Sequence, residues 1–525
     1  MVPAFCGHTP GSQLDWNYTA EVGQLNRTVE LTRGFVLGGS SSISTSTLNS
    51  EDWDRYARVT GDPGWSWDAL QPYLRKNERF TPPSDGHNTT GEFDPAVHGF
   101  HGVNSVSLSG FRHEFDDRII NASKSSNDEF RFNLDYNSGN QLGIGRDRES
   151  IEVQKSTEDD CSGYGQTTVF NGTRSSSATS YLAPHFIQRP NLHVLLHAHV
   201  TKLLSDQLKF HGVELSQDTG QTHHQVTARN EIILSAGSVG TPQLLMLSGI
   251  GDTKSLTSLG ITPVHHLPSV GQNLTEQPVV LSRWLVNTTD TDDTAGRNTT
   301  LAAEQLEQWM QARSGPLVNA PIIDVGWVRL EEDAEIFERF EDPSAGPNTA
   351  HWELIFVNGP IGPPAPSGNL VSASPALVAP VSRGCITLNS SDPFDHPIID
   401  LNLVNSDFDL FAFRDALRRI DRFMHSSSFD GFVISSTINA TTDEELDFYI
   451  KSQVRPAGHL VGTASMSAKG ASWGVVDPNL RVKGVKGLRV VDASVLPLTP
   501  AAHTQVPVYM VAERAADLIK DAWKE

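Results

Sequence analysis

Apolar and polar residues recur with different periods along the chain, and these periods predict where helices and strands lie. In residues 52–80, aromatic and leucine positions recur at helical spacing on either side of a Pro63-Gly64 turn, which predicts two short helices with a buried aromatic seam. Residues 81–165 are instead rich in proline, glycine, asparagine and serine. This composition predicts surface loops interrupted by one helix near residues 116–126.

Residues 191–251 have the pattern of an α/β unit. Short apolar runs at Leu192–Leu196 and Gly212–Leu215 predict strands, and a β-branched run beginning at Glu231 leads into a helix predicted over Gln243–Leu247. A strand that ends in Ala-Gly at the start of a helix is typical of a doubly wound sheet that presents backbone amides to a ligand.

Residues 278–454 predict a second domain of sheet plus helices. Its predicted strands and helices are Trp352–Val357, Asn369–Val381, Leu301–Arg313 and Asp407–His425. The final part of the chain returns to the α/β pattern, with a strand that begins at Gly487 and an amphipathic helix over Val506–Trp523. The fold class expected from these patterns is therefore α/β combined with α+β.

Composition and charge narrow the function classes. A chain of 525 residues, 38% hydrophobic and 19% charged, is long enough for two domains with sizeable cores. Its net charge of −22, without a run of lysine or arginine, argues against nucleic acid or an anionic membrane as partner. The 3 cysteines are widely separated, so neither a disulfide framework nor a clustered metal site is expected.

Glycosylation sequons favour a secreted protein. About five would arise by chance in a chain this rich in asparagine, serine and threonine, and the sequence holds more. They lie at Asn17, Asn26, Asn88, Asn121, Asn171, Asn273, Asn287, Asn298, Asn389 and Asn439. The first residues have neither the basic nor the apolar region of a signal peptide, which leaves a cytosolic chain or a lost beginning as the two interpretations. No apolar run approaches the ~18 residues of a membrane span.

Three sequence motifs carry a family resemblance that extends over nearly the whole chain. They are Gly38-Gly39-Ser40-Ser41, Ser235-Ala-Gly-Ser-Val-Gly-Thr-Pro and the tail that contains Gly458-His459 and Ala502-His503. Together they resemble the glucose-methanol-choline (GMC) oxidoreductases. Within that family, Trp473-Gly-Val-Val-Asp-Pro and Val491-Asp-Ala-Ser are most similar to fungal aryl-alcohol oxidases and pyranose dehydrogenases.

The resemblance implies a flavin domain assembled from separated stretches and a substrate domain that contains an antiparallel sheet and helices. The expected flavin domain comprises residues 1–60, 185–275 and 455–525, and the expected substrate domain with its surface loops comprises residues 61–184 and 276–454. The implied activity is FAD-dependent oxidation of primary aryl or aliphatic alcohols or of sugars. Oxygen or a quinone would accept the electrons, and a monomer is expected.

His459 and His503 are the expected catalytic residues. Oxidation of an alcohol requires removal of the hydroxyl proton as hydride leaves the carbon, and a neutral imidazole is a suitable base. We assign this role to His459. The resemblance implies that His503 binds the same substrate oxygen and holds it in register, and the two roles could be exchanged.

Further positions are expected to bind the flavin. They resemble flavin-contacting positions of the family or lie at helix starts, and they are Gly38, Gly39, Ser40, Val200, Ala236, Asp492, Ala493, Thr504, Gln505 and Val506. The N-terminus of the last helix would direct free amides and a positive dipole end at the flavin, where the reduced ring is anionic. Phe35 stands where some family members have a histidine bonded covalently to the flavin, so non-covalent FAD is expected.

The sequence also departs from the family. No G-x-G-x-x-G motif follows a strand, and the chain begins where family members are already well into the fold, so the first βαβ unit is expected to be missing. Its loss would weaken flavin binding and expose apolar edges of the parallel sheet. The alternative function is therefore a flavin-free, inactive remnant or truncated product that acts as a non-catalytic glycoprotein. A third is a lyase of the same fold that splits cyanohydrins.

Overall fold

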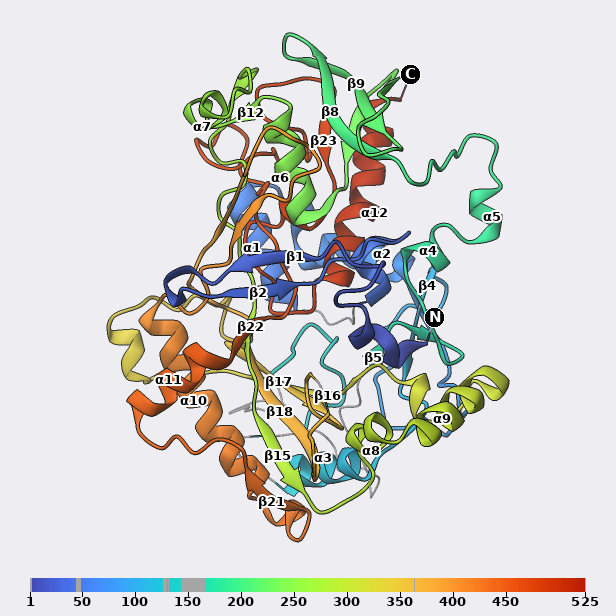
Figure 1. Cartoon of the computed structure of the whole chain (residues 1–525), viewed down its shortest axis with the longest axis vertical. Coiled ribbons are helices and arrows are strands. Elements are labelled where there is room, and N and C mark those ends of the chain that lie inside the picture. The colour runs from blue at the N-terminus through green and yellow to red at the C-terminus, as the bar shows by residue number, and fades with distance from the viewer. Residues whose placement is uncertain are drawn as a thin grey trace.

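The computed structural model describes residues 2–43, 49–125, 130, 132–142, 166–362 and 364–524. At one end of its long axis lies a large antiparallel sheet, and at the other lie a strand hairpin and the helices α6 and α12 (Figure 1). None of the helices in these ranges is long and apolar enough to cross a membrane.

A short parallel pair of strands organises the α/β part of the chain. Strand β11 (Ile232–Leu234) pairs in parallel with β23 (Leu488–Val490), and Ile232 lies opposite Leu488. Helix α6 (Gly237–Leu247) follows β11, and helix α12 (Gln505–Ala522) ends the chain. The predicted parallel α/β arrangement is thus present, but α6 begins earlier than the predicted helix.

The strand predicted over residues 192–196 is wrong. These residues form no strand in the structure, and the side chains of Leu195 and Leu196 are 59% and 52% exposed. A strand is stabilised by the backbone hydrogen bonds of a partner strand, which an apolar run alone does not supply. Ile233 of β11 is also exposed, and the described partner of β11 is β23 alone.

Two further groups of strands belong to the fold, one wholly antiparallel and one mixed. The first has the order β10-β9-β8 and comprises β8 (His199–Asp206), β9 (Lys209–Ser216) and β10 (His224–Thr227). The second has the order β19-β20-β1-β2 and comprises β1 (Tyr18–Glu21), β2 (Thr28–Leu31), β19 (Cys385–Thr387) and β20 (Ile398–Asp400). In the second group, distant parts of the sequence meet, since β1 pairs in parallel with β20.

The largest sheet lies almost entirely in the predicted substrate domain, and its described strand pairs are all antiparallel, as predicted. Its main path is β16-β17-β18-β14-β22, and β15 pairs with both β18 and β21. Its strands are β14 (Pro278–Val280), β15 (Arg283–Val286), β16 (Ile322–Val328), β17 (Trp352–Val357), β18 (Asn369–Leu377), β21 (Val433–Ser436) and β22 (Val454–Pro456). The helices around it are α8 (Asp292–Arg297), α9 (Thr299–Ala312), α10 (Asp407–Met424) and α11 (Asp443–Gln453).

The two predicted aromatic helices are present as α1 (Ser50–Thr60) and α2 (Trp67–Asn77). The aromatic seam is buried, since Trp53 and Tyr56 of α1 and Trp65 between the helices are each at most 1% exposed. Helix α2 packs against α12, which places the seam beside the end of the chain.

The expected loop region contains more structure than its composition indicates. The predicted helix is present as α3 (Glu114–Ser125), but β4 (Asn104–Leu108) is a fully buried strand between β3 (Glu78–Phe80) and β5 (Gln166–Thr167). Part of the predicted loop, residues 143–165, lies outside the described residues. The remaining short elements are β6 (Val169–Phe170), β7 (Thr173–Arg174), α4 (Ser177–Ser180), α5 (Pro184–Ile187), β12 (Ile250–Gly251), α7 (Thr253–Ser258) and β13 (His265–His266).

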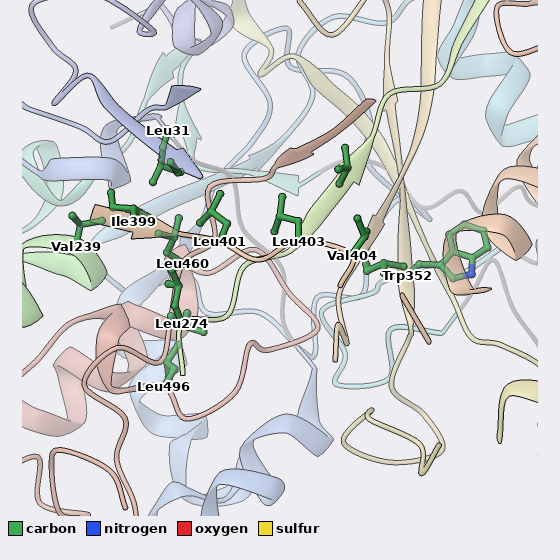
Figure 2. Close-up of a cluster of buried hydrophobic side chains, with 14 of the residues drawn as sticks. Leu31, Val239, Leu274, Trp352, Ile399, Leu401, Leu403, Val404, Leu460 and Leu496 are labelled. Atoms are coloured by element: carbon green, nitrogen blue, oxygen red, sulfur yellow. The ribbon is translucent and has the colours of Figure 1, made fainter. Parts of the chain in front are cut away.

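One hydrophobic cluster joins the α/β part to the large sheet. Figure 2 shows buried side chains that run from Val239 of α6 past Leu401 and Leu403 to Trp352 of β17. Each of these side chains is less than 5% exposed. Because this core is continuous, loops from both parts of the chain are held in fixed positions where they meet.

Candidate active site

The two predicted catalytic histidines lie side by side. His459 follows β22, and His503 lies just before α12; their ring centroids are 5.0 Å apart and the rings are tilted by 39°. Gly458 has a φ of +87°, so the chain turns into His459 through a conformation that favours glycine. The structure therefore brings together two residues that are distant in sequence.

Glu276 holds the backbone of the His459 loop. Its Oε1 atom accepts hydrogen bonds from the backbone N–H groups of Gln277 at 2.9 Å, Gly458 at 3.0 Å and His459 at 2.9 Å. Its Oε2 atom is buried and has no hydrogen-bond partner. Burial raises the pKa of Glu276 to about 7, although these hydrogen bonds and the charge of Arg33 act in the opposite direction.

Gln277 holds the imidazole of His459. The Nδ1 atom of His459 lies 2.6 Å from Oε1 of Gln277. Burial lowers the pKa of His459 well below its usual value, and the nearby charges of His503 and Arg33 lower it further. His459 is therefore a neutral imidazole at neutral pH, which is the state that a base requires.

Glu353 binds the second histidine. It lies on the central strand β17, is 1% exposed, and places a carboxylate oxygen 2.9 Å from Nε2 of His503. Trp327, which lies opposite Glu353 on the neighbouring strand β16, has its ring centroid 6.4 Å from that of His503. The two histidines consequently differ in their partners, because one faces an amide and the other a carboxylate.

Arg33 links the glycine-serine loop to His459. Its Nη1 atom donates to the carbonyl of Gly458 at 2.5 Å, and its Nε atom donates to Oγ of Ser40 at 3.1 Å. Gly39 begins the 3₁₀ turn Gly39–Ile43, which contains Ser40. The structure therefore links the loop of the predicted flavin contacts Gly38, Gly39 and Ser40 to the loop of His459.

The start of α12 lies beside the same loop. Nε2 of Gln505 lies 3.5 Å from the carbonyl oxygen of Ser41. Thr504, which precedes the helix, makes no capping hydrogen bond with its side chain, so the first helical amides near Gln505 and Val506 keep their donor capacity. This helix end suits a negatively charged or electron-rich group.

The carboxylate of Asp492 is occupied by hydrogen bonds from other protein groups. Its Oδ2 atom accepts from the backbone N–H of Gly237 at 2.9 Å and from Oγ1 of Thr241 at 2.6 Å, and its Oδ1 atom accepts from the backbone N–H of Ser494 at 2.9 Å. The carboxylate thus joins the end of β23 to the start of α6. Only the backbone of Asp492, with its neighbour Ala493, remains available for a cofactor contact.

The remaining two predicted contacts lie on α6 and β8. Ala236 is exposed at the N-terminus of α6, and Oγ of Ser238 in the same turn donates to the carbonyl of Leu460 at 2.6 Å, which brings this turn to the histidine loop. Val200 lies on β8 and packs against the main core. Its link to the histidines is indirect, because β8 contacts α6.

These residues fit the ring end of a flavin. Gly39 and Gly237 both have positive φ, and a Cβ atom added at either position would meet nothing within 4 Å, so a flat ligand can approach the backbone there. The free amides at the start of α12 add a positive end. Within the described ranges, no three histidine, cysteine or acidic side chains gather as metal ligands.

Sequence reasoning missed four residues of this site. Arg33, Glu276, Gln277 and Glu353 were not among the expected site residues, although each contacts a histidine or its loop. Glu353 carried a usable signal, since it is the single charged residue in the otherwise apolar strand Trp352–Val357. The other three act across distances in sequence that no local pattern reveals.

Comparison with known proteins gives consistent matches. Two family models described as GMC oxidoreductase match residues 18–279 and 380–512. A dehydrogenase of Hericium erinaceus is 40% identical over 96% of this chain and 85% of its own length. Pyranose dehydrogenase 3 of Leucoagaricus meleagris is 37% identical over 99% of this chain and 86% of its own length. A formate oxidase variant from Aspergillus oryzae, solved to study modification of its FAD, superposes with a TM-score of 0.86 at 29% identity over 99% of this chain and 91% of that one.

Proposed function

We propose that this chain, which belongs to the GMC oxidoreductase family, oxidises the hydroxyl group of an alcohol or sugar with His459 as the base. It is an oxidoreductase that acts on CH–OH donors, and FAD is the cofactor that its family implies. The observation that carries the assignment of the base is the neutral imidazole of His459, buried beside His503 and held by Gln277.

In this mechanism the two histidines have different roles. His459 accepts the hydroxyl proton of the substrate, because its lowered pKa keeps it unprotonated at the start of each cycle. His503, paired with the Glu353 carboxylate, holds the same oxygen in register. Bound FAD would supply the acceptor for the hydride that leaves the carbon. The start of α12 would then stabilise negative charge on the ring.

A sugar or other polyhydroxylated substrate is favoured over an aryl alcohol. The carboxylate of Glu353 is buried beside His503, and such a group binds hydroxyls better than it binds an aromatic ring. The pyranose dehydrogenase relative supports the same choice. Oxygen or a quinone would reoxidise the flavin, and we expect the chain to be a monomer.

We also propose that FAD is bound without a covalent link. Phe35, at the position where some family members attach the flavin, is 54% exposed and packs edge-on against Trp16 with ring centroids 4.5 Å apart. A phenyl ring has no atom that could form such a bond. Denaturation of the holoenzyme should therefore release all flavin into the filtrate.

We further propose a secreted glycoprotein. Nine of the sequon asparagines are exposed, so an oligosaccharide could be attached at each without disturbing the core. Asn273 is the exception, since its Nδ2 atom donates to Oγ of Ser465 and to the carbonyl of Pro497, and Thr275 of the same sequon is fully buried. Mass spectrometry after deglycosylation should find modified asparagine at exposed sequons and not at Asn273.

The test is an absorption spectrum of the purified chain with added FAD, followed by anaerobic addition of sugars, aliphatic alcohols and aryl alcohols. We expect a flavin band near about 450 nm that bleaches with a sugar, and bleaching slowed by about 10²–10⁴-fold in His459→Ala. A chain that binds no flavin would instead support the inactive glycoprotein. Release of cyanide from a cyanohydrin without bleaching would select the lyase.

A further inference from the structure

We propose that Gln277 is a positioning residue that decides which nitrogen of His459 carries the proton. The inference rests on the proposed role of His459 as the base. Its structural content is the contact of 2.6 Å between Nδ1 of His459 and Oε1 of Gln277. The contact alone does not say which atom is the donor, and the remaining hydrogen bonds of Gln277 supply the answer.

The amide of Gln277 can point in only one way. Its Nε2 atom lies 2.8 Å from the carbonyl oxygen of Pro500 and 3.1 Å from that of Ala502. Both partners are backbone carbonyls, which only accept hydrogen bonds, so the atom that faces them must be the N–H donor. If the amide were flipped, an oxygen would face two oxygens in a buried site.

The orientation of the amide fixes the tautomer of the imidazole. Since Oε1 of Gln277 is an acceptor, Nδ1 of His459 must carry the hydrogen. In the neutral ring, Nε2 is then the nitrogen with the free lone pair, which is the atom able to take a substrate proton. The imidazolium formed by that transfer still donates from Nδ1, so Gln277 serves both states without moving.

An amide suits this position better than a carboxylate. A carboxylate beside Nδ1 would favour the imidazolium and raise the pKa of the base. The neutral amide orients the ring without adding charge. The anchoring carbonyls of Pro500 and Ala502 flank the segment that leads directly into His503. Gln277 therefore also ties the two histidine loops together.

The experiment is nitrogen NMR of the chain with histidine labelled by ¹⁵N, at a pH near 7.5 where the neutral ring is observed. The His459 resonances are identified by their loss in His459→Gln. We expect the wild-type ring to be in the Nδ1–H form. In Gln277→Met it should move toward the Nε2–H form that imidazole prefers in water. An Nε2–H form or an even mixture of tautomers in the wild type would overturn the proposal.

This measurement does not depend on flavin reduction, so it separates the two proposals. If the wild-type ring is in the Nδ1–H form but no alcohol reduces the flavin, the tautomer assignment stands and the proposed function fails. If alcohols reduce the flavin but the ring is in the Nε2–H form, the function stands and Gln277 loses its role.

Kinetics give a second readout in the active holoenzyme. We expect Gln277→Met to slow flavin reduction by about tenfold to a hundredfold, less than removal of the base itself, with little change in KM. The matched control is Gln217→Met, because Gln217 is exposed and its Nε2 atom donates to the carbonyl of Leu196, away from the histidines. Equal slowing in both variants, or an unchanged rate in Gln277→Met, would count against the proposal.

Discussion

The Nε2 atom of His503 lies 2.9 Å from a carboxylate oxygen of Glu353, a residue 150 positions earlier in the chain, and both side chains are almost fully buried. A buried carboxylate keeps its charge at low cost only when a donor faces it. The histidine and the acid therefore stabilise each other. Their contact also joins strand β17 of the largest sheet to the start of α12.

Two replacements of Glu353 should distinguish the loss of its charge from the loss of its hydrogen-bond acceptor. In Glu353→Gln an acceptor oxygen remains, so we expect the free energy of unfolding to change by less than about 1 kcal/mol. In Glu353→Leu the N–H of His503 loses its acceptor, and we expect a loss of about 1–3 kcal/mol. Urea denaturation measures both. A leucine variant as stable as the wild type would contradict the stabilising role of this hydrogen bond.

The rate of flavin reduction should not fall in mildly acidic solution. Because the pKa of His459 lies well below 6.5, the limiting rate of reduction should stay constant from about pH 8 to below about pH 6.5 before it falls. The charge of Arg33 contributes to this, so Arg33→Met should move the acidic limb to higher pH. The control is Arg58→Met, since Arg58 donates to the carbonyl of Ala345 on the surface. Stopped-flow reduction across pH gives the two profiles.

Stability should fall with rising pH through Glu276. Its folded pKa of about 7 lies above its ordinary value of 4.5, so the folded chain holds a proton that the unfolded chain has released. The stability from this group is therefore present below about pH 4.5 and is lost as pH rises through about 7. As the pH rises between these limits, the free energy of unfolding of Glu276→Gln should increase relative to that of the wild type by up to about 3 kcal/mol. Denaturant titrations at pH 5 and pH 8 measure the difference, and an equal difference at both would refute the assignment.

The buried histidine His98 should stabilise the fold by pairing with two carboxylates. His98 lies between Glu78 and Asp135, with ring nitrogens 2.9 Å and 2.8 Å from their carboxylates. Burial alone would lower the pKa of His98, but the hydrogen bonds to Asp135 and Glu78 prevail and raise it to about 9. The stabilisation is therefore complete below about pH 6.5 and is lost as pH rises through about 9.

His98→Leu should leave the carboxylates of Glu78 and Asp135 without their positive partner. We expect it to lower the free energy of unfolding by about 3–5 kcal/mol at pH 6. The cost should shrink at pH 10, where the wild type has lost the charge as well. His425→Leu is the control, because His425 is 59% exposed and its partner Asp421 lies 3.6 Å away. That change should alter stability by about 0.5 kcal/mol or less. Guanidinium midpoints at the two pH values test both variants.

The closeness of His459 and His503 could be expected because their motifs are local, whereas the residues that hold them could not. Gly458-His459 and Ala502-His503 are short motifs, and the structure places the two rings 5.0 Å apart, while the catalytic role of the pair stays a prediction. Gln277 lies 182 positions from His459, so its hydrogen bond depends on how β14 and the His459 loop meet, which no local period encodes. Whether the ten expected flavin contacts bind FAD stays a prediction, as does the division into two domains.

Secondary structure was predictable where burial leaves a clear pattern in the sequence. The strand Trp352–Val357 is buried along its whole length and is a nearly continuous apolar run, whereas helix α10 has one buried face at helical spacing, and both match their predicted positions within one residue. The strand predicted from the apolar run at residues 192–196 was wrong, because hydrophobicity alone does not provide a partner strand. The α6 helix starts earlier than predicted: the backbone N–H of Gly237 donates to Asp492 at its first residue, and the helix continues through Pro242 in its interior.

The parallel pair of β11 and β23 also sets the order of events during synthesis. Ser235 at the end of β11 binds the carbonyl of Val491, a residue 256 positions later. Until the ribosome has translated that far, β11 has no β23 beside it, and the loop of His459 has neither Asp492 nor α12 to complete its surroundings. The candidate site therefore cannot be complete until the last part of the chain has been synthesised.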